Sequence, residues 1–150
     1  MTVKSDTFIR DLLFFVKNDL LNHITDPLTG VRNSQSKFVM TSYPQRKVEY
    51  PVITIKLTNY TGTSSGMQTT TMDVVAFIEI RVWGRNQKEK DELANDCYKR
   101  LRDIQFTATT GSIANYLYNF TLISATEVDE EGEHQPKSRI LNIRYKFFNA

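Results

Sequence analysis

The sequence predicts an α+β fold: an antiparallel or mixed sheet of four to five strands with two helices packed on one face. Three observations predict it. Apolar residues alternate strictly along Gln68 to Trp83, a capped helical pattern follows at once, and the elements come in the order helix, strand, strand, helix, strand, strand. Residues 1–150 contain no linker or internal repeat, so we expect a single domain.

The first helix is expected to begin at Ser5 or Asp6, which can cap it, and to run to about Asn22. Its apolar residues recur at helical spacing: Phe8, Ile9, Leu12, Leu13, Val16, Leu20 and Leu21. The turn sequence from Asp26 to Gly30 ends this region. Within the polar and basic stretch that follows, Phe38-Val39-Met40 is compatible with a short strand or with a loop that packs on a neighbour.

The first long strand is expected over Tyr50 to Leu57, where Ile53, Ile55 and Leu57 share a face. Asn59 to Gly66 is rich in Thr, Ser and Gly, and it predicts a loop. In the next strand the alternating apolar residues form a face that must be buried: Met72, Val74, Ala76, Ile78, Ile80 and Val82. The opposite face is mixed in character, which indicates a partly exposed side of the sheet.

Asn86 is suited to cap the second helix, and Glu89 has the spacing of the reciprocal member of a capping box. This helix is expected to run to about Ile104, with Leu93, Cys97 and Leu101 on its buried stripe. Two more strands follow, and we expect them to pair antiparallel. The first has Tyr116, Tyr118, Phe120 and Leu122 on one side and Leu117 and Ile123 on the other; the second alternates through Leu141, Ile143, Tyr145 and Phe147.

Charge and composition argue against several kinds of partner. The formal net charge is +2, so no overall field draws the chain to nucleic acid or to anionic lipid. No apolar run approaches the roughly 20 residues of a membrane span, and no secretory signal is evident, so we expect no membrane partner. Cys97 is the only cysteine, which rules out an intrachain disulfide and favours a reducing compartment such as a cytoplasm.

Few residues suggest metal binding or catalysis. His23 and His134 are the only histidines, and with one cysteine they make a poor zinc set, so we expect neither a metal nor a cofactor. Gly62-Thr63-Ser64-Ser65-Gly66 matches the G-x-S-x-G nucleophile elbow, but a strand follows where a helix is required. We therefore expect a polar hairpin loop there and not an enzyme; a hydrolase using Ser64 remains an alternative.

Two charged segments offer other surfaces. Five carboxylates lie within seven residues and lack the spacing of a calcium loop: Glu127, Asp129, Glu130, Glu131 and Glu133. A solvated hairpin tip is the simple interpretation, and in a ring of several copies the same loop would form a negative collar. The basic stretch from Arg32 to Lys47, with Tyr43, is the alternative platform for a small nucleic-acid-binding accessory domain.

The run from Val74 to Trp83, followed by a polar cap and then by Glu92-Leu93-Ala94 and Leu101 on a helix, resembles the middle of tail-terminator proteins of tailed bacteriophages and viruses. Tyr50 to Ile55 is similar to that family as well, and the order of elements matches over nearly the whole chain. A head-completion or adaptor protein of the same neck is the nearest alternative.

The resemblance implies a structural virion component of the tail or neck, made in the host cytoplasm, that caps the tail tube as a ring, commonly a hexamer. Its partners would be further copies, the tail tube protein and the head-completion or connector proteins. DNA would pass through the hole without sequence-specific binding. A negative lumen would repel phosphates, so the Glu127 to Glu133 segment is the candidate lumen or ring-face element.

Apolar residues that a monomer has no need to expose indicate where copies would meet. Phe77 and Trp83 lie on the mixed face of the long strand with Glu79 and Arg81, and the run Phe38-Val39-Met40 is also apolar. The candidate subunit interface is therefore Phe38, Met40, Phe77, Glu79, Arg81 and Trp83.

Overall fold

The computed structural model describes residues 8–28, 30–32, 37–43, 48–64, 66–67, 72–104, 117–128 and 137–149. Along these residues the elements are α1 (Phe8–His23), β1 (Val39–Met40), β2 (Val52–Ser64), β3 (Met72–Gly84), α2 (Gln87–Asp103), β4 (Leu117–Val128) and β5 (Lys137–Asn149). The order is the predicted one with the short β1 added before β2. The α+β fold class is confirmed.

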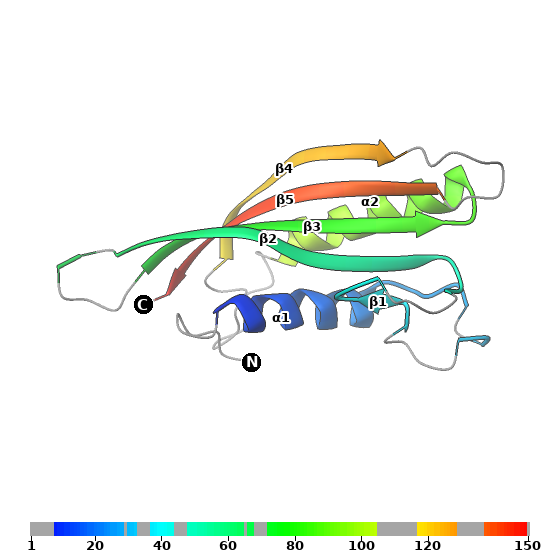
Figure 1. Cartoon of the computed structure of the whole chain (residues 1–150), viewed down its shortest axis with the longest axis horizontal. Coiled ribbons are helices and arrows are strands. Elements are labelled where there is room, and N and C mark those ends of the chain that lie inside the picture. Colours follow the sequence, from blue (N-terminus) through cyan, green and yellow to red (C-terminus); the bar gives the residue numbers. More distant parts are fainter. Residues whose placement is uncertain are drawn as a thin grey trace.

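The strands form one sheet in the order β1-β2-β3-β5-β4 (Figure 1). β1 is parallel to β2, and the other neighbouring pairs are antiparallel, including the predicted pair of β4 and β5. β3 and β4 therefore run in the same direction with β5 inserted between them. Since α2 lies on the connection from β3 to β4, this half of the sheet is a split βαβ unit.

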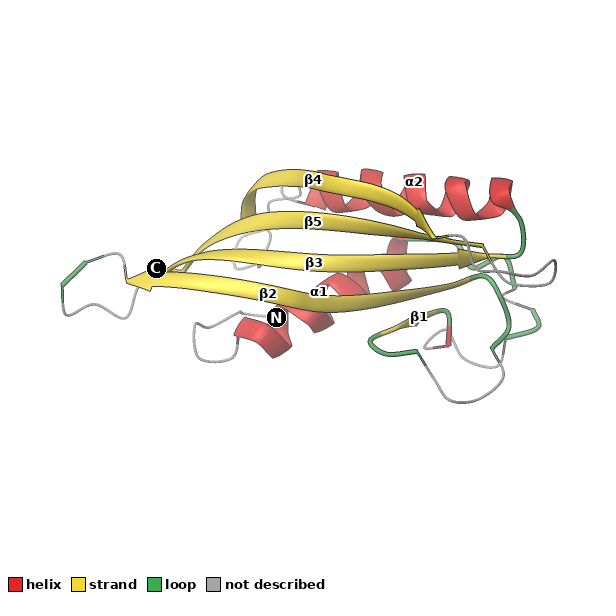
Figure 2. Cartoon of the chain, turned by 45° about the horizontal axis from the view of Figure 1, so that its top comes forward, coloured by secondary structure: helices red, strands yellow, loops and turns green. Residues whose placement is uncertain are grey.

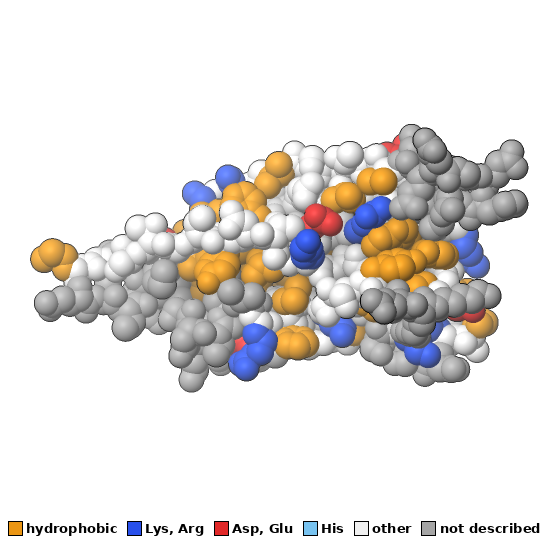
Figure 3. All heavy atoms as spheres, in the orientation of Figure 1, with side chains coloured by type: hydrophobic (Ala, Val, Ile, Leu, Met, Phe, Trp, Pro, Cys, Tyr) orange, Lys and Arg blue, Asp and Glu red, His pale blue; other side chains and the backbone are white. Residues whose placement is uncertain are grey.

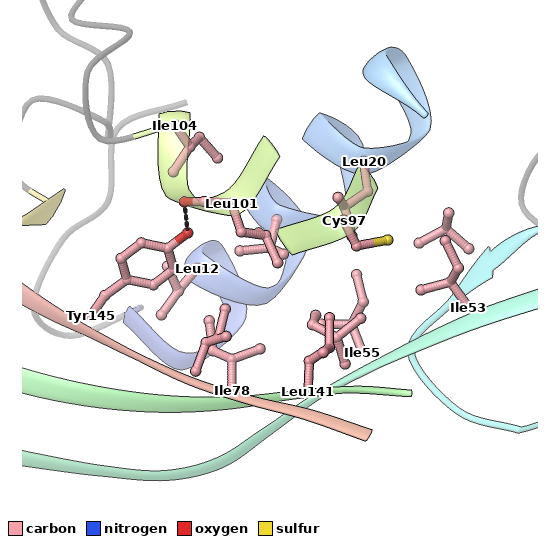
Figure 4. Packing of buried hydrophobic residues seen from close by; sticks show 14 of the residues in the cluster. Leu12, Leu20, Ile53, Ile55, Ile78, Cys97, Leu101, Ile104, Leu141 and Tyr145 are labelled. Atoms are coloured by element: carbon pink, nitrogen blue, oxygen red, sulfur yellow. Dashed lines mark hydrogen bonds between the residues drawn. The ribbon is translucent and has the colours of Figure 1, made fainter. Parts of the chain in front are cut away.

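Both helices lie on the same face of the sheet, as predicted, because their apolar stripes and alternate strand residues belong to one core (Figures 2 and 4). The buried side chains of β3 are Val74, Ala76, Ile78, Ile80 and Val82, and those of β5 are Leu141, Ile143, Tyr145 and Phe147. The helices contribute Leu12, Val16, Leu20, Leu93, Ala94, Cys97, Leu101 and Ile104. The predicted alternation of the long strand is thus confirmed from Val74 onward, while residues 68–71 lie outside the described part.

α2 begins as the sequence predicts, with one difference. The Asn86 side chain accepts a hydrogen bond from the Glu89 amide at 2.9 Å. In a capping box the Glu89 carboxylate would accept from the amide of the cap residue, Asn86. Here it accepts from the Arg85 amide at 3.0 Å, one residue earlier, and it also binds the Arg85 guanidinium. Gly84, the last residue of β3, leaves no room for a side chain, because a Cβ there would lie 2.7 Å from the Lys90 amide nitrogen. The first turn of α2 thus packs directly on the end of the strand.

The two helices are joined by an ion pair. Arg100 of α2 donates to both carboxylate oxygens of Asp19 on α1, each at 2.7 Å. His23, the last residue of α1, is within 2.8 Å of the Asp19 carbonyl oxygen through its Nδ1. A second polar contact ties α2 to the sheet, since the buried Tyr145 hydroxyl donates to the Leu101 carbonyl (Figure 4). These contacts fix the helices against each other and against β5.

A buried arginine organises the segment between α1 and β2. Arg32 donates to the Asp26 carboxylate at 2.7 Å, and both side chains are almost fully buried, at 3% and 1% exposed. The same guanidinium donates to the carbonyls of Lys37, Glu49 and Pro51. One side chain thus holds the backbone at Lys37 and the backbone at Glu49 and Pro51, which leads into β2.

β2 is longer than the sequence predicts. The stretch Asn59 to Gly66 was expected to be a loop, but the strand continues through Ser64, paired with β3 as far as Met72. The expectation was wrong because Thr and Tyr also favour strands, and β3 supplies a long partner that a single segment cannot reveal. Thr58 is an extra residue in the register between Leu57 and Asn59, which makes a β-bulge.

β4 does not keep the simple alternation that the sequence suggests. Its register with β5 shifts between Tyr118 and Thr121 and again between Leu122 and Ser124, and Asn119 has a φ of 54°. As a result Tyr118 pairs with a residue of the exposed face, whereas Leu122 pairs with the core residue Ile143. The expected grouping of Tyr118 and Leu122 on one side is therefore wrong, since each bulge inverts the order of faces.

Candidate assembly surface

The sheet has a second face, opposite the helices, which we call the open face. It carries the odd-numbered residues of β3, of which Val75, Phe77, Glu79 and Arg81 are half-buried. In Figure 1 the strands are drawn in front of α2, and Figure 3 shows hydrophobic side chains on that side, beside lysine and arginine side chains. No described helix packs on this face.

Three members of the predicted interface are buried within the chain, so the prediction that they are exposed is wrong. Phe38 is fully buried in the main core, and the Arg32 guanidinium lies 5.4 Å from its ring centroid. Met40 and Trp83 are 7% and 6% exposed and form a second small core with Val52. The chain itself covers these apolar side chains, because β1 adds to the sheet beside β2 and the residues after it fold over Trp83.

The other three members, Phe77, Glu79 and Arg81, lie on the open face as predicted. Glu79 stands between Lys56 of β2 and Asn142 of β5 in the strand register. Arg81 donates to the Ser138 hydroxyl at 3.2 Å, and its guanidinium lies 4.6 Å from the Trp83 ring. This stack shields one face of the indole.

An aromatic cleft of about 450 Å³ opens beside this arginine. The Tyr43 ring packs on Trp83 at 5.0 Å, and its hydroxyl is hydrogen-bonded to that of Tyr50. Lys56 and Glu79 line the opposite side. The cleft therefore combines an aromatic wall with charged groups of both signs.

A second pocket, of about 310 Å³, lies at the two bulges. The extra residues Thr58 of β2 and Ile123 of β4 both line it, together with Phe77 and Asn142 between them. Thr58 donates its hydroxyl to the Phe77 carbonyl at 3.1 Å. The bulges thus leave a shallow apolar depression that crosses the middle of the open face. No sequence pattern indicated this pocket, because it forms only when β2 and β4 lie on either side of β3 and β5.

The acidic segment is divided by the structure. Glu127 was expected in a loop, but it lies in β4 and binds Lys90, whose side chain is completely buried at the start of α2. Hydrogen bonds from Lys90 and Gln87 lower the pKa of Glu127. Asp91 connects α2 to β5 nearby, since its carboxylate binds the Arg139 guanidinium at 2.9 Å. Glu127 is thus tied to α2, and the rest of the segment, Asp129, Glu130, Glu131 and Glu133, lies outside the described residues.

The described residues that the sequence suggested for catalysis, nucleic-acid binding or metal binding are not brought together into a site. Ser64 ends β2 and donates to the Gly66 carbonyl at 2.9 Å, so it has no nucleophile-elbow geometry; His134 lies outside the described residues. Arg32 is buried and paired, which removes it from the proposed nucleic-acid platform, while Arg46 and Lys47 are not described. The described residues contain no group of three or more His, Cys, Asp or Glu side chains that could hold a metal ion.

Comparison with known protein families and with curated protein sequences found no match. Among the described helices, none is both long enough and apolar enough to span a membrane.

Proposed function

We propose that this chain is a tail terminator, a structural component of the neck of a tailed virus that caps the tail tube as a ring and joins it to the head-completion proteins. The proposal starts from the resemblance of the segments Tyr50 to Ile55 and Val74 to Trp83. It is supported by the open face, which is the observation that carries it. A wide sheet face with a central apolar depression suits contact with another protein surface.

The distribution of side chains on the open face is that of a contact surface. Phe77 lies at its centre, with Ile123 beside it in the pocket, and Ile123 is 51% exposed. Charged groups of both signs, Lys56, Glu79 and Arg81, line the neighbouring cleft. An apolar centre with charged groups around it is common in protein interfaces, where the charges set orientation more than affinity.

The proposal is tested by mixing the purified protein with purified tail tubes of a tailed virus and imaging the mixture by negative stain. We expect a ring at one end of each tube. Phe77→Lys should abolish the rings, because it places a charge at the centre of the open face, whereas Phe14→Lys should not. Phe14 is a matched control, since it is 43% exposed but lies on α1.

Other outcomes separate the alternatives. Rings that bind isolated head connectors and not tubes would assign the chain to the head-completion or adaptor proteins. A salt-dependent gel shift with short DNA, without binding to either structure, would favour the nucleic-acid-binding domain and contradict the proposal. Circular dichroism of both variants checks that loss of binding does not come from unfolding.

A further inference from the structure

The two outer edges of the sheet have no charged residues along most of their length. Leu57–Ser64 of β2, which we call the β2 edge, and Leu117–Thr126 of β4, the β4 edge, contain no Asp, Glu, Lys or Arg. The interior strands are the charged ones, with Asp73, Glu79 and Arg81 on β3 and Lys137, Arg139, Arg144 and Lys146 on β5. This is the reverse of the usual pattern, in which charges protect edge strands from pairing.

Both edges offer backbone groups for pairing. β1 pairs with β2 only at Ile53 and Thr54, so among the described residues no strand lies outside the β2 edge. On the other side, β4 is the last of the strands that the described residues form. In Figure 1 the end of β2 projects with β3 to the left, beyond both helices. An edge strand left in this state is a template for a strand of another chain.

Exposed apolar side chains gather on the same two edges. Tyr60 is 43% exposed on the β2 edge, and Tyr118, Leu122 and Ile123 are 44%, 37% and 51% exposed on the β4 edge. Cross-strand pairs of aromatic and β-branched side chains are favourable when two strands meet. Both edges lack charge, and pairing would bring the exposed apolar side chains of the β4 edge against Tyr60 and the β-branched threonines of the β2 edge.

Strand direction decides how two copies would fit. β2 is antiparallel to β3, β3 to β5, and β5 to β4, so β2 and β4 of one copy run in opposite directions. When a second copy is placed beside the first in the same orientation, its β2 therefore meets β4 of the first in antiparallel order. The helices of both copies then remain on one side and the open faces on the other.

We propose that the β4 edge of one copy pairs with the β2 edge of the next, so that a single antiparallel sheet continues from copy to copy. This contact is heterologous, joining two different surfaces, and such a contact closes into a ring or grows into a filament. The inference rests on the self-association in the proposed function, but it places the contact between copies at the two edges and leaves the open face for the tail tube or the head-completion proteins. It requires no particular number of copies.

Two variants test the pairing. Tyr60→Lys/Thr61→Lys blocks the β2 edge, and Leu122→Lys/Ile123→Lys blocks the β4 edge, each by placing charges on both sides of the strand. The control, Phe14→Lys/Val31→Lys, changes two exposed apolar residues away from both edges. Light scattering at high protein concentration gives the mass of each protein, and circular dichroism confirms folding.

We expect the wild type and the control to form assemblies and each edge variant alone to be a monomer. An equimolar mixture of the edge variants should give a one-to-one dimer that grows no further, because the two edges left unpaired in that dimer are the ones blocked by lysine. A monomeric wild type, an edge variant that assembles alone, or a mixture without the dimer would overturn the proposal. An edge variant that dimerises with itself would instead show an isologous contact.

Amide hydrogen exchange of the wild-type protein tests the edge pairing independently, because it does not require the variants to fold. Within residues 57–64 and 117–126, the outward-pointing amides that do not bond to β3 or β5 should exchange at least about tenfold more slowly at assembling concentration than in dilute solution. Unchanged exchange at both edges in an assembled sample would contradict the pairing. Assembly through these edges without binding to tail tubes would contradict the proposed function but would still support the edge pairing.

Discussion

Arg32→Met tests the buried ion pair that organises the segment before β2. The change leaves the Asp26 carboxylate, 1% exposed, without its arginine, and it removes the donor to the carbonyls of Lys37, Glu49 and Pro51. Removing one partner of a buried pair costs about 3–5 kcal/mol. For a chain of this size, that loss corresponds to a fall of about 6–20 °C in Tm.

Urea denaturation followed by circular dichroism measures this loss. Arg10→Met is the control, because Arg10 is 67% exposed and its pair with Asp11 should contribute less than about 1 kcal/mol. The double variant Asp26→Leu/Arg32→Met should recover part of the stability, since it removes both buried charges. A loss below about 1 kcal/mol in Arg32→Met, with an unchanged m value, would refute the reasoning.

Three further outcomes follow from local geometry. In the same assay, Gly84→Ala should destabilise the protein by about 1–3 kcal/mol, because a Cβ there would lie 2.7 Å from the α2 backbone. Gly30→Ala should change the stability little, since nothing lies within 4 Å of a Cβ there. Equal losses in the two variants would contradict this explanation. Burial raises the pKa of Cys97 to about 12, so Ellman's reagent should not label the folded protein at pH 8 and should label it in urea; rapid native labelling would disprove it. The hydrogen bond from Arg85 lowers the pKa of Glu89 below its ordinary 4.5. The ionised Glu89 carboxylate therefore stabilises the fold fully above pH 4.5, and this stabilisation is lost as the pH falls through the lower pKa of the folded state. Glu89→Gln should make the free energy of unfolding depend less on pH in this range. An unchanged dependence on pH would exclude a stabilising role for the Glu89 carboxylate.

Local patterns were sufficient for much of the fold. The alternation from Val74 to Val82 and from Leu141 to Phe147 predicted buried strand faces, and Asn86 predicted the start of α2. Each of these signals depends on residues close together in the chain, which share one strand or one helical turn. They also predicted that both helices lie on a single face, since the strands around Val74–Val82 and Leu141–Phe147 each had only one consistently apolar side.

The tertiary structure decided which apolar residues are exposed and where the strands end. Phe38, Met40 and Trp83 are apolar in any reading of the sequence, but they are buried because β1 and the residues after it lie against β2 and β3. The extension of β2 to Ser64 depends on a partner strand, and the bulges of β4 depend on its register with β5. The sequence alone therefore determined the type of most elements and the composition of their faces. Only the packed chain determined which residues meet on the open face, its central pocket and which strands form the edges, because each of these depends on separate strands brought together.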